Sequence, residues 1–297
     1  MFTEQRLNEA YQGALKRKIN DQSKYIFFSD QHRGDDSVSD EFQRNQMLFI
    51  AALEYYNKEG YTYVELGDGD ELWEHKEFRH IRIAHSDVFT TMKKFYDDHR
   101  MIMIYGNHNM KLRDPDYVAK NYYYYYDEYE EKNTELFPRL KPVEALVLMY
   151  EKTGQHIFAV HGHQGDAAND QFWIPTMLSV RYFWRFIHLV GFKNPASPSK
   201  NQTTRHIVEK HYSKWVRKNR VMLICGHTHR MKFPKRGEVP YFNCGCCIHS
   251  KGINGIEILN GKIMVVQWRV VVDENQYVRV KRTIIRGPQD ISSFYSK

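Results

Sequence analysis

The sequence predicts an α/β fold, and three patterns support this prediction. Short runs of β-branched and aromatic residues recur along the chain, as they do in buried strands. Segments with helical periodicity separate the first of these runs, and this alternation is typical of parallel strands joined by helices. After Asn243 the pattern changes to strands separated by tight turns. We therefore expect parallel strands early in the chain and antiparallel strands at its end.

The first group of predicted strands covers residues 25–29, 61–66, 101–105, 157–160 and 221–225. Apolar residues of segment 42–56 recur at helical spacing between the first two strands, and Gly60 is placed to end that helix. A second helix is expected at about 85–99, again between two strands. This order predicts polar side chains gathered at the C-terminal ends of neighbouring strands.

The later strands are predicted at 255–259, 262–268 and 278–285, with Asn260 and Gly261 forming a hairpin turn. Two segments, 117–140 and 167–219, interrupt this scheme. The first contains five consecutive tyrosines at 122–126. Within the second of them, 194–199 is expected to be a loop. We expect one domain over residues 1–297, with 167–219 as a helical insertion that forms a lid or cap.

The composition is that of a globular protein. A chain of 297 residues, 42% of them hydrophobic, can bury a large core. The 43 Lys and Arg residues against 36 Asp and Glu residues favour binding to phosphates, nucleic acid or anionic lipid, without selecting among them. Residues 1–20 lack a signal-peptide core and no segment is apolar enough to span a bilayer, so we expect a cytoplasmic protein. The four cysteines suit small buried residues better than a zinc–thiolate site at 244–247.

Five fragments at the ends of predicted strands are rich in metal-binding residue types. They are Asp30-Gln31-His32, Gly67-Asp68-Gly69-Asp70-Glu71, Gly106-Asn107-His108-Asn109, His161-Gly162-His163 and Gly226-His227-Thr228-His229. Residues two apart on a strand face the same way, so an Asp-x-His or His-x-His pair can hold one cation or two adjacent ones. The glycines permit tight turns close to the ions. Mixed Asp, Asn and His ligands favour manganese, iron or zinc.

In this order the fragments resemble the motifs DxH, GDxxD, GNHx, HGH and GHxH of the calcineurin-type metallophosphoesterases. The resemblance extends over most of the chain, from Asp30 to His229. It implies a β-sandwich of two mixed sheets flanked by helices, and a site for two divalent metal ions. The metal ligands that it implies are Asp30, His32 and His229 for the first ion, Asn107, His161 and His227 for the second, and Asp68 as a bridge.

The resemblance also implies a mechanism, in which a hydroxide that bridges the two metals attacks a phosphate group. His108 corresponds to a histidine that assists the leaving oxygen. Glu71 is the expected partner of its other ring nitrogen, with Asp70 as the alternative. The sequence departs from the family pattern at Glu71, where Asp is more usual, and at Asn109, where a carboxylate is usual.

The same resemblance implies a phosphorylated substrate. Arg33 and Arg230, each adjacent to a ligand motif, are expected to contact its phosphate, and His163 is expected to support the metal ligands or contact the substrate. Segment 172–192 is predicted to be a helix that is apolar over much of its circumference. It either packs on the core or a second chain, or forms a lid with peripheral membrane or lipid contact through 172–193. Its position resembles the insertion of the UDP-diacylglucosamine pyrophosphohydrolase branch, which makes a nucleotide-linked lipid the alternative substrate.

Two other classes of protein are weighed against the hydrolase. A non-catalytic scaffold of this family tends to lose metal ligands or the histidine equivalent to His108, and here all of them are present. A nuclease would suit the net charge of +7, but the chain has no basic run and no dedicated nucleic-acid module. The sequence makes no prediction of oligomeric state.

Overall fold

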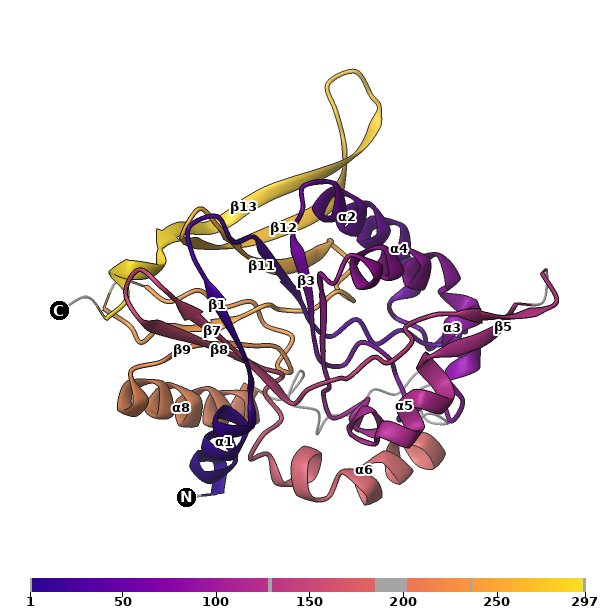
Figure 1. The fold of residues 1–297 in the computed structure, drawn as a ribbon, viewed down its shortest axis with the longest axis horizontal. Coiled ribbons are helices and arrows are strands. Elements are labelled where there is room, and N and C mark those ends of the chain that lie inside the picture. The colour runs from indigo at the N-terminus through magenta and orange to yellow at the C-terminus, as the bar shows by residue number, and fades with distance from the viewer. Residues whose placement is uncertain (1, 128–129, 185–201, 236, 296–297) are drawn as a thin grey trace.

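The computed structural model describes residues 2–127, 130–184, 202–235 and 237–295. Two β-sheets lie face to face, and helices cover the outer side of each sheet (Figure 1). Both sheets contain parallel and antiparallel pairs of strands. The expected α/β fold of two mixed sheets flanked by helices is therefore confirmed.

The first sheet has six strands in the order β13-β12-β11-β2-β3-β4. Their bounds are β2 Tyr25–Phe28, β3 Thr62–Leu66, β4 Met101–Ile104, β11 Ile253–Leu259, β12 Lys262–Val272 and β13 Val278–Asp290. The strands β2, β3 and β4 are parallel, and the C-terminal strands join the sheet in antiparallel fashion. Helices α2 (Gln46–Lys58) and α4 (Ser86–Asp97) connect the parallel strands and pack on the outer face.

The second sheet has five strands in the order β1-β7-β8-β9-β10. Their bounds are β1 Leu15–Ile19, β7 Ala145–Tyr150, β8 Gln155–Val160, β9 Met222–Cys225 and β10 Tyr241–Asn243. Helices α1 (Phe2–Gly13) and α8 (Gln202–Asn219) cover its outer face, where Leu7 and Trp215 pack against Phe158. Strands buried on both faces are expected to be continuously apolar, as β9 and residues 157–160 of β8 are.

The core between the sheets is what makes them a sandwich. Phe27, Leu66 and Ile104 of the six-stranded sheet pack with Leu146 and Ile157 of the other sheet, and all five are fully buried. Each such side chain contributes roughly 1.5–3 kcal/mol when it leaves water. The packing fixes the two sheets relative to each other, and so aligns the strand ends that carry the polar fragments.

The expected hairpin at Asn260 and Gly261 is confirmed. Leu259 pairs with Lys262, and both turn residues have positive φ, as a two-residue turn between antiparallel strands requires. The following hairpin of β12 and β13 continues beyond the layers of the sandwich (Figure 1). The sheets therefore gain their antiparallel strands from the end of the chain, as predicted.

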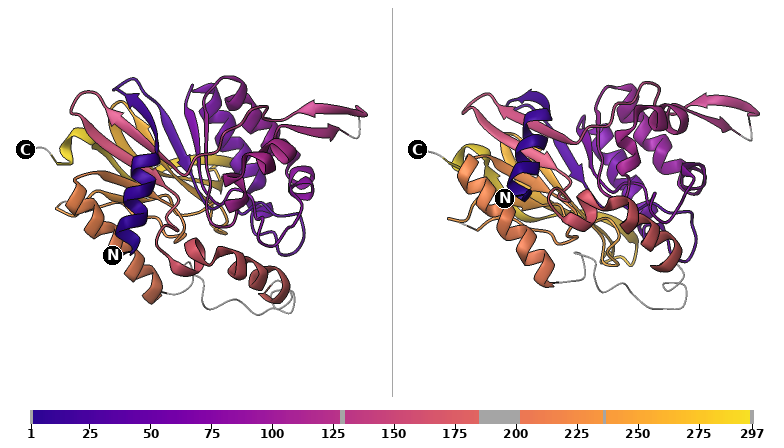
Figure 2. Two further views of the ribbon diagram at one scale, coloured as in Figure 1. Left: turned by 60° about the horizontal axis from the view of Figure 1, so that its bottom comes forward. Right: turned by 90° about the horizontal axis from the view of Figure 1, so that it is seen from below.

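The expected insertion at 167–219 is corrected by the structure, because its last part belongs to the sandwich. Helix α8 packs on the five-stranded sheet with α1, so it is one of the flanking helices and no part of a cap. The earlier part forms a π-helical turn at Ala167–Gln171, helix α6 (Trp173–Ser179) and a second π-helical turn at Val180–Trp184. Figure 2 shows α6 on the side of the molecule where α1 begins. Residues 185–192 of the expected helix, and the expected loop 194–199, lie outside the described residues.

Smaller elements complete the fold beside the six-stranded sheet. They are α3 (Phe78–Ala84), α5 (Pro115–Tyr122), the hairpin of β5 (Tyr124–Asp127) and β6 (Lys132–Glu135), and 3₁₀ helices at Gln43–Asn45, Met110–Arg113 and Ile291–Ser293. The tyrosine run therefore spans the end of a helix and the start of a strand, with Tyr122 buried and Tyr124 exposed. Among the residues described, none of the helices combines the length and apolarity needed to cross a bilayer.

Candidate metal centre

The five polar fragments converge at one edge of the sandwich. They follow β2, β3 and β4 of one sheet and β8 and β9 of the other. Ligand atoms of Asp30, His32 and His229 lie within 4.8 Å of one another, and so do those of Asp68, His161 and His227. The structure thus brings together the side chains that the sequence predicts for two adjacent cations.

Asp68 belongs to the second group and also lies near the first. Its Oδ2 is 3.0 Å from His161 Nε2 in one group and 3.9 Å from His32 Nε2 in the other. Oδ1 accepts a hydrogen bond from the His108 amide at 2.8 Å, so Oδ2 is the oxygen that faces both groups. The position fits the bridging role that the resemblance implies for Asp68.

The backbone at the site is unusual, because five of the seven expected ligands have positive φ. The values are 56° for Asp30, 50° for His32, 51° for Asp68, 65° for His227 and 53° for His229. This left-handed conformation costs a residue with a side chain roughly 1–2 kcal/mol. The ligands are grouped as predicted, but for a different reason. We expected the alternation of a strand to orient these side chains. Instead, left-handed turns beyond the strands orient them.

Hydrogen bonds between the fragments hold these turns. The amide of Asp30 donates to the Gly67 carbonyl at 3.1 Å, and the amide of His32 donates to the Asp68 carbonyl at 2.9 Å. The amide of His227 donates to Asp30 Oδ2 at 2.9 Å, which links the two sheets directly. Because each turn is held by another fragment, the ligands are positioned as one unit.

Close packing explains two of the glycines in the fragments. A Cβ atom at Gly106 would lie 2.1 Å from Asp68 Oδ1, and one at Gly226 would lie 2.5 Å from Asp30 Oδ2. Real Cβ atoms do not approach oxygen this closely, so only glycine lets the backbone pass beside the two carboxylates. The sequence-based expectation of tight glycine turns is met at these positions.

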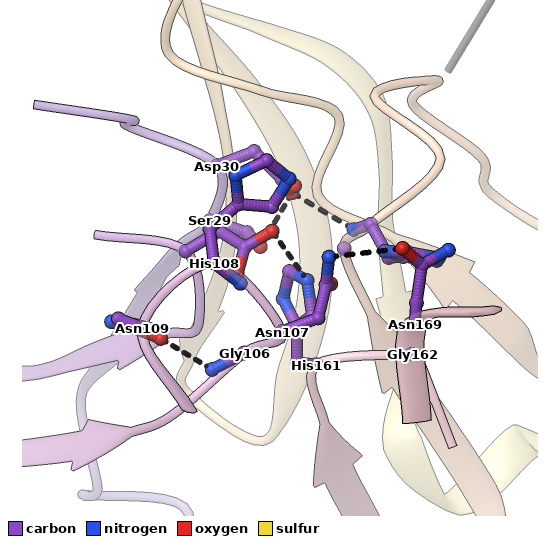
Figure 3. A network of polar contacts seen from close by, with 12 residues as sticks. Ser29, Asp30, Gly106, Asn107, His108, Asn109, His161, Gly162 and Asn169 are labelled. Carbon is purple, nitrogen blue, oxygen red and sulfur yellow. Dashed lines mark hydrogen bonds and ion pairs between the residues drawn. The ribbon is translucent and has the colours of Figure 1, made fainter. Parts of the chain in front are cut away.

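Several buried ligand atoms lack any hydrogen-bond partner within the described part of the chain. These atoms are Asp30 Oδ1, Asn107 Oδ1, His161 Nε2 and His227 Nε2. A buried polar atom left in this state costs about 1–3 kcal/mol, so a group of them is rare without a ligand. Figure 3 shows Asp30, Asn107 and His161 gathered in this region.

The hydrogen bonds of the histidines show which nitrogen atoms carry lone pairs into the site. His161 Nδ1 donates to the Leu66 carbonyl at 2.9 Å, so its Nε2 faces Asp68 with a lone pair when the ring is neutral. His32 Nδ1 donates to Glu71 at 2.7 Å, and its Nε2 then meets His229 Nε2 at 3.2 Å. Lone pairs that face one another at such distances repel unless a proton or a metal ion lies between them. With the buried ligand atoms that lack partners, this arrangement fits two metal ions.

The electrostatics of the carboxylates agree with this fit. Burial raises the pKa of Asp30, but His229 and His32 lower it further, so the pKa lies well below its usual range. Burial likewise opposes ionisation of Asp68, while His161 and His108 bring its pKa down. Both side chains are therefore anions. With imidazole and amide ligands beside them, the donor set suits manganese, iron or zinc.

His108 lies at the opening of the site and contacts Glu71, as expected. Its Nδ1 donates to Glu71 Oε1 at 2.7 Å, and its side chain is 23% exposed. The alternative partner Asp70 is engaged elsewhere, because it accepts hydrogen bonds from Arg33 and Tyr122. The geometry therefore selects Glu71, and leaves Nε2 of His108 as the nitrogen available to a ligand.

Glu71 has a second contact that the sequence did not predict. Its Oε2 accepts a hydrogen bond from Nδ1 of His32, so one carboxylate holds both imidazoles. Burial raises the pKa of Glu71, but His108 and His32 lower it well below its usual range. The extra methylene of glutamate at this position gives the carboxylate the reach for two partners.

The departure at Asn109 leaves the local turn intact. Asn109 Oδ1 accepts a hydrogen bond from the Gly106 amide at 2.6 Å (Figure 3). A carboxylate oxygen at this position could accept the same bond, so the amide preserves the turn that presents Asn107 and His108. Asn107 itself donates to Asn169 at 3.4 Å, which leaves its carbonyl oxygen for a metal.

The expected role of Arg33 in substrate binding is wrong. Its side chain is fully buried, and its guanidinium makes two hydrogen bonds to Glu65, at 2.8 and 2.9 Å, and one to Asp70 at 2.8 Å. All of its charge is thus directed into the protein, away from the metal ligands. Arg33 instead joins β3 to the turn that contains Asp70.

The other two expected substrate contacts lie in different surroundings. Arg230 is exposed next to His229. His163 is fully buried, and neither ring nitrogen has a hydrogen-bond partner among the described residues. His163 lines a cavity of about 330 Å³. The other lining residues are Arg6, Glu9, Tyr105, Met110, Arg113, Glu144, Asp170 and Trp173, of which Arg113 is exposed.

The cysteines behave as expected for small buried residues. All four are free and buried, and burial raises the pKa of each thiol. A zinc–thiolate site needs the deprotonated form, which this environment disfavours. No cysteine belongs to any metal-capable group in the described ranges.

Comparison with known proteins gives little beyond the fold. No family model and no curated protein matches the chain. A conserved protein of Streptococcus pneumoniae, described as a predicted phosphoesterase, aligns with 88% of this chain and 97% of its own, at 13% identity and a TM-score of 0.36. Vps29 of Entamoeba histolytica in complex with zinc aligns with 89% and 99%, at 13% identity and a TM-score of 0.35. A cold-active protein-tyrosine phosphatase of a psychrophilic Shewanella species aligns with 92% and 84%, at 12% identity and a TM-score of 0.39. Likeness at this level carries no functional conclusion, so the function is argued from the site.

Proposed function

We propose that the protein is a hydrolase of phosphate esters that uses two divalent metal ions. The observation that carries this proposal is the pair of adjacent ligand groups, which meet at Asp68, with buried ligand atoms that lack hydrogen-bond partners in the described part of the chain. No packing requirement produces such a group of unsatisfied atoms, which destabilises the folded protein unless a cation binds. The manganese, iron and zinc ions all suit these donors.

Each ligand has a definite place in this proposal. Asp30, His32 and His229 would hold one ion, Asn107, His161 and His227 would hold the other, and Asp68 would serve both. When bound, the two ions supply a water nucleophile of lowered pKa and positive charge for the phosphate oxygens. The hydrogen bonds of His32 to Glu71 and of His161 to Leu66 keep these rings in the tautomer that ligation requires.

His108 assists the departure of the leaving oxygen in this proposal. Glu71 occupies its Nδ1, so the proton or hydrogen bond for the leaving group comes from Nε2. Glu71 is an anion and accepts the hydrogen bond that keeps Nδ1 of the ring protonated. A positioned acid of this kind typically contributes a factor of about 10²–10⁴ to the rate.

The organic part of the substrate has a candidate place in the cavity beside the site. His163 forms one wall of it, and its ring nitrogens are free to pair with a polar substrate group. The charged side chains in the lining include three acids, Glu9, Glu144 and Asp170, which do not favour a second phosphate there. We assign His163 and Arg230 as substrate contacts, with Arg230 on the exposed side.

A second candidate substrate is a nucleotide-linked lipid such as UDP-diacylglucosamine, cleaved at its pyrophosphate. The observation that favours it is a stripe of exposed apolar side chains at helical spacing, formed by Ile174, Leu178 and Tyr182. Such a stripe suits acyl chains or the surface of a membrane. Peripheral membrane contact through 172–193 belongs to this second candidate.

The test combines elemental analysis of the purified protein with hydrolysis of p-nitrophenyl phosphate and its bis ester, with and without manganese. About two metal ions per chain and manganese-dependent turnover would support the proposal, and the preferred ester would separate a phosphatase from a diesterase. Metal without turnover on either ester would favour the pyrophosphate-linked lipid. Failure to bind metal under any loading condition would overturn the proposal.

Three variants sharpen this test. Asp68→Asn should lose metal, because the bridging carboxylate is replaced by a neutral amide. His108→Ala should keep both ions and lose about 10²–10⁴-fold in turnover. His80→Ala, at an exposed position, is the matched control and should retain both properties. Full activity in either site variant would contradict the assignments.

A further inference from the structure

The segment that precedes residue 185 contacts the turn next to His108. Arg181 donates from Nη2 to the Leu72 carbonyl at 2.8 Å and from Nε to the Trp73 carbonyl at 2.9 Å. Two parallel bonds from one planar guanidinium fix both the place and the direction of the backbone that they bind. Arg181 thereby attaches the helical segment 173–184 to the turn that follows Glu71.

Trp73 carries this contact to the imidazole. Its ring stacks on that of His108, with centroids 4.2 Å apart and an angle of 23° between the planes. Trp73 is 3% exposed, and its indole Nε1 has no hydrogen-bond partner in the described part of the chain. No hydrogen bond from Nε1 to the described residues therefore holds the indole. Its orientation depends on packing and on the position of the Trp73 backbone.

The imidazole of His108 is constrained on three sides. Glu71 binds its Nδ1 at 2.7 Å, Trp73 covers one face, and His32 meets it edge-on with centroids 4.6 Å apart. A single hydrogen bond to Nδ1 restrains rotation of the ring about its Cβ–Cγ bond only in part. The stacked indole removes this rotation, and so sets the direction in which Nε2 points.

We propose that Arg181 and Trp73 are positioning residues, which together orient His108 towards the leaving group. Arg181 fixes the Leu72 and Trp73 carbonyls, the fixed backbone places the indole, and the indole holds the imidazole. This inference rests on the proposed function for the role of His108, but the contact between Arg181, Trp73 and His108 is independent of it. The helical segment 173–184 therefore helps to orient His108, the proposed acid. Through Trp173 it also borders the cavity.

The first experiment measures the position of the ring without turnover or added metal. In protein with isotope-labelled histidine, the ring protons of His108 are identified by their loss in His108→Ala. Stacking on an indole should shift them upfield. Trp73→Ala should remove that shift. Arg181→Gln keeps the Trp73 side chain in the protein, but should reduce the shift because the indole is no longer held against His108. An unchanged His108 signal in Arg181→Gln would overturn the coupling.

The second experiment measures the use of the acid with two esters. Phenolate is a far more basic leaving group than p-nitrophenolate, so phenyl phosphate depends more on the assistance of His108. Trp73→Ala and Arg181→Gln should lower kcat on phenyl phosphate by about three- to tenfold and change kcat on p-nitrophenyl phosphate much less. Trp73→Phe, which keeps an aromatic face, should recover most of the loss.

Controls separate positioning from folding. Arg44 also donates to a backbone carbonyl, that of Glu41, but lies on an exposed 3₁₀ helix, so Arg44→Gln should change neither measurement. Arg181→Lys keeps the charge with one donor in place of the fork, and should fall between Arg181→Gln and the unmodified protein. Equal losses on both esters would indicate a structural effect and overturn the inference. If the unmodified protein hydrolysed neither ester, the proposed function would be contradicted. The His108 signal would still show whether Arg181 and Trp73 position the ring.

Discussion

Arg33 offers a stringent test of the structure, because it is buried beside the site without taking part in it. Replacing it by methionine keeps most of the volume and removes the guanidinium. Glu65 would then lose the fork that neutralises it and keep only the Tyr63 hydroxyl, at 2.9 Å. Asp70 would keep only the Tyr122 hydroxyl, at 2.7 Å. The variant therefore leaves two buried carboxylates without a counter-charge.

The size of the effect follows from the burial. Arg33, Glu65 and Asp70 are all fully buried, and removal of one partner from such a group destabilises a protein by about 3–5 kcal/mol. Unfolding entropy is about 2.1 cal/mol/K per residue, so in a chain of 297 residues each kcal/mol corresponds to about 1.6 °C in Tm. We therefore expect Arg33→Met to lower Tm by about 5–8 °C.

Urea unfolding and calorimetry measure this loss directly. The double variant Arg33→Met with Glu65→Met removes the bidentate pair as a whole, and should recover part of the stability, because Glu65 is no longer unpaired while Asp70 still is. Lys93→Met breaks an exposed pair with Asp97 and should change stability by less than about 0.5 kcal/mol. A loss below about 1 kcal/mol for Arg33→Met would refute the reasoning, because it would mean that water reaches Glu65.

Three further predictions concern other parts of the chain. His227→Ala removes a ligand from one group alone, so elemental analysis should find about one metal ion per chain instead of about two. Burial raises the pKa of Asp40, but His85 and backbone amides lower it further, to below 3.8. The ionised form of Asp40 therefore stabilises the fold above that pH. This stabilisation disappears as the pH falls through the folded-state pKa. Urea unfolding should accordingly show Asp40→Asn less stable than the unmodified protein at pH 7, with a difference that narrows in acid. The four cysteines should not react with a thiol reagent in the native state and should all react in urea, since burial keeps them protonated and covered.

The strands that carry the site were predictable because each is a buried apolar run that stops at a polar residue. The prediction at 61–66 became β3, and that at 221–225 became β9, each within one residue. Their convergence was predictable as well, since parallel strands present their C-terminal ends at one edge of a sheet. Strand β1 was missed because its sequence, Leu-Lys-Arg-Lys-Ile, has exposed basic residues where a buried strand has apolar ones.

The errors arise where the direction of a side chain depends on the turns. Arg33 was expected at the substrate because it follows the ligand His32 in the sequence, but the turn at His32, with φ of 50°, is followed by a side chain that points into the core. The contact of Glu71 with His32 spans 39 positions, and no local pattern encodes it. The assignment of α8 to the insertion was avoidable, because Tyr212, Trp215 and Val216 form an apolar stripe of the kind that packs on a sheet.

The place of β11 in its sheet has a consequence for how the protein is made. Strand β11 lies directly beside β2, and Ile256 pairs with Phe27, three residues before the first ligand motif begins at Asp30. On the ribosome, β2 therefore remains an open strand edge until almost the whole chain has been synthesised. Apolar edges of this kind recruit strands from other molecules. A message truncated before codon 253 should accordingly yield an insoluble product, although it encodes every proposed metal ligand.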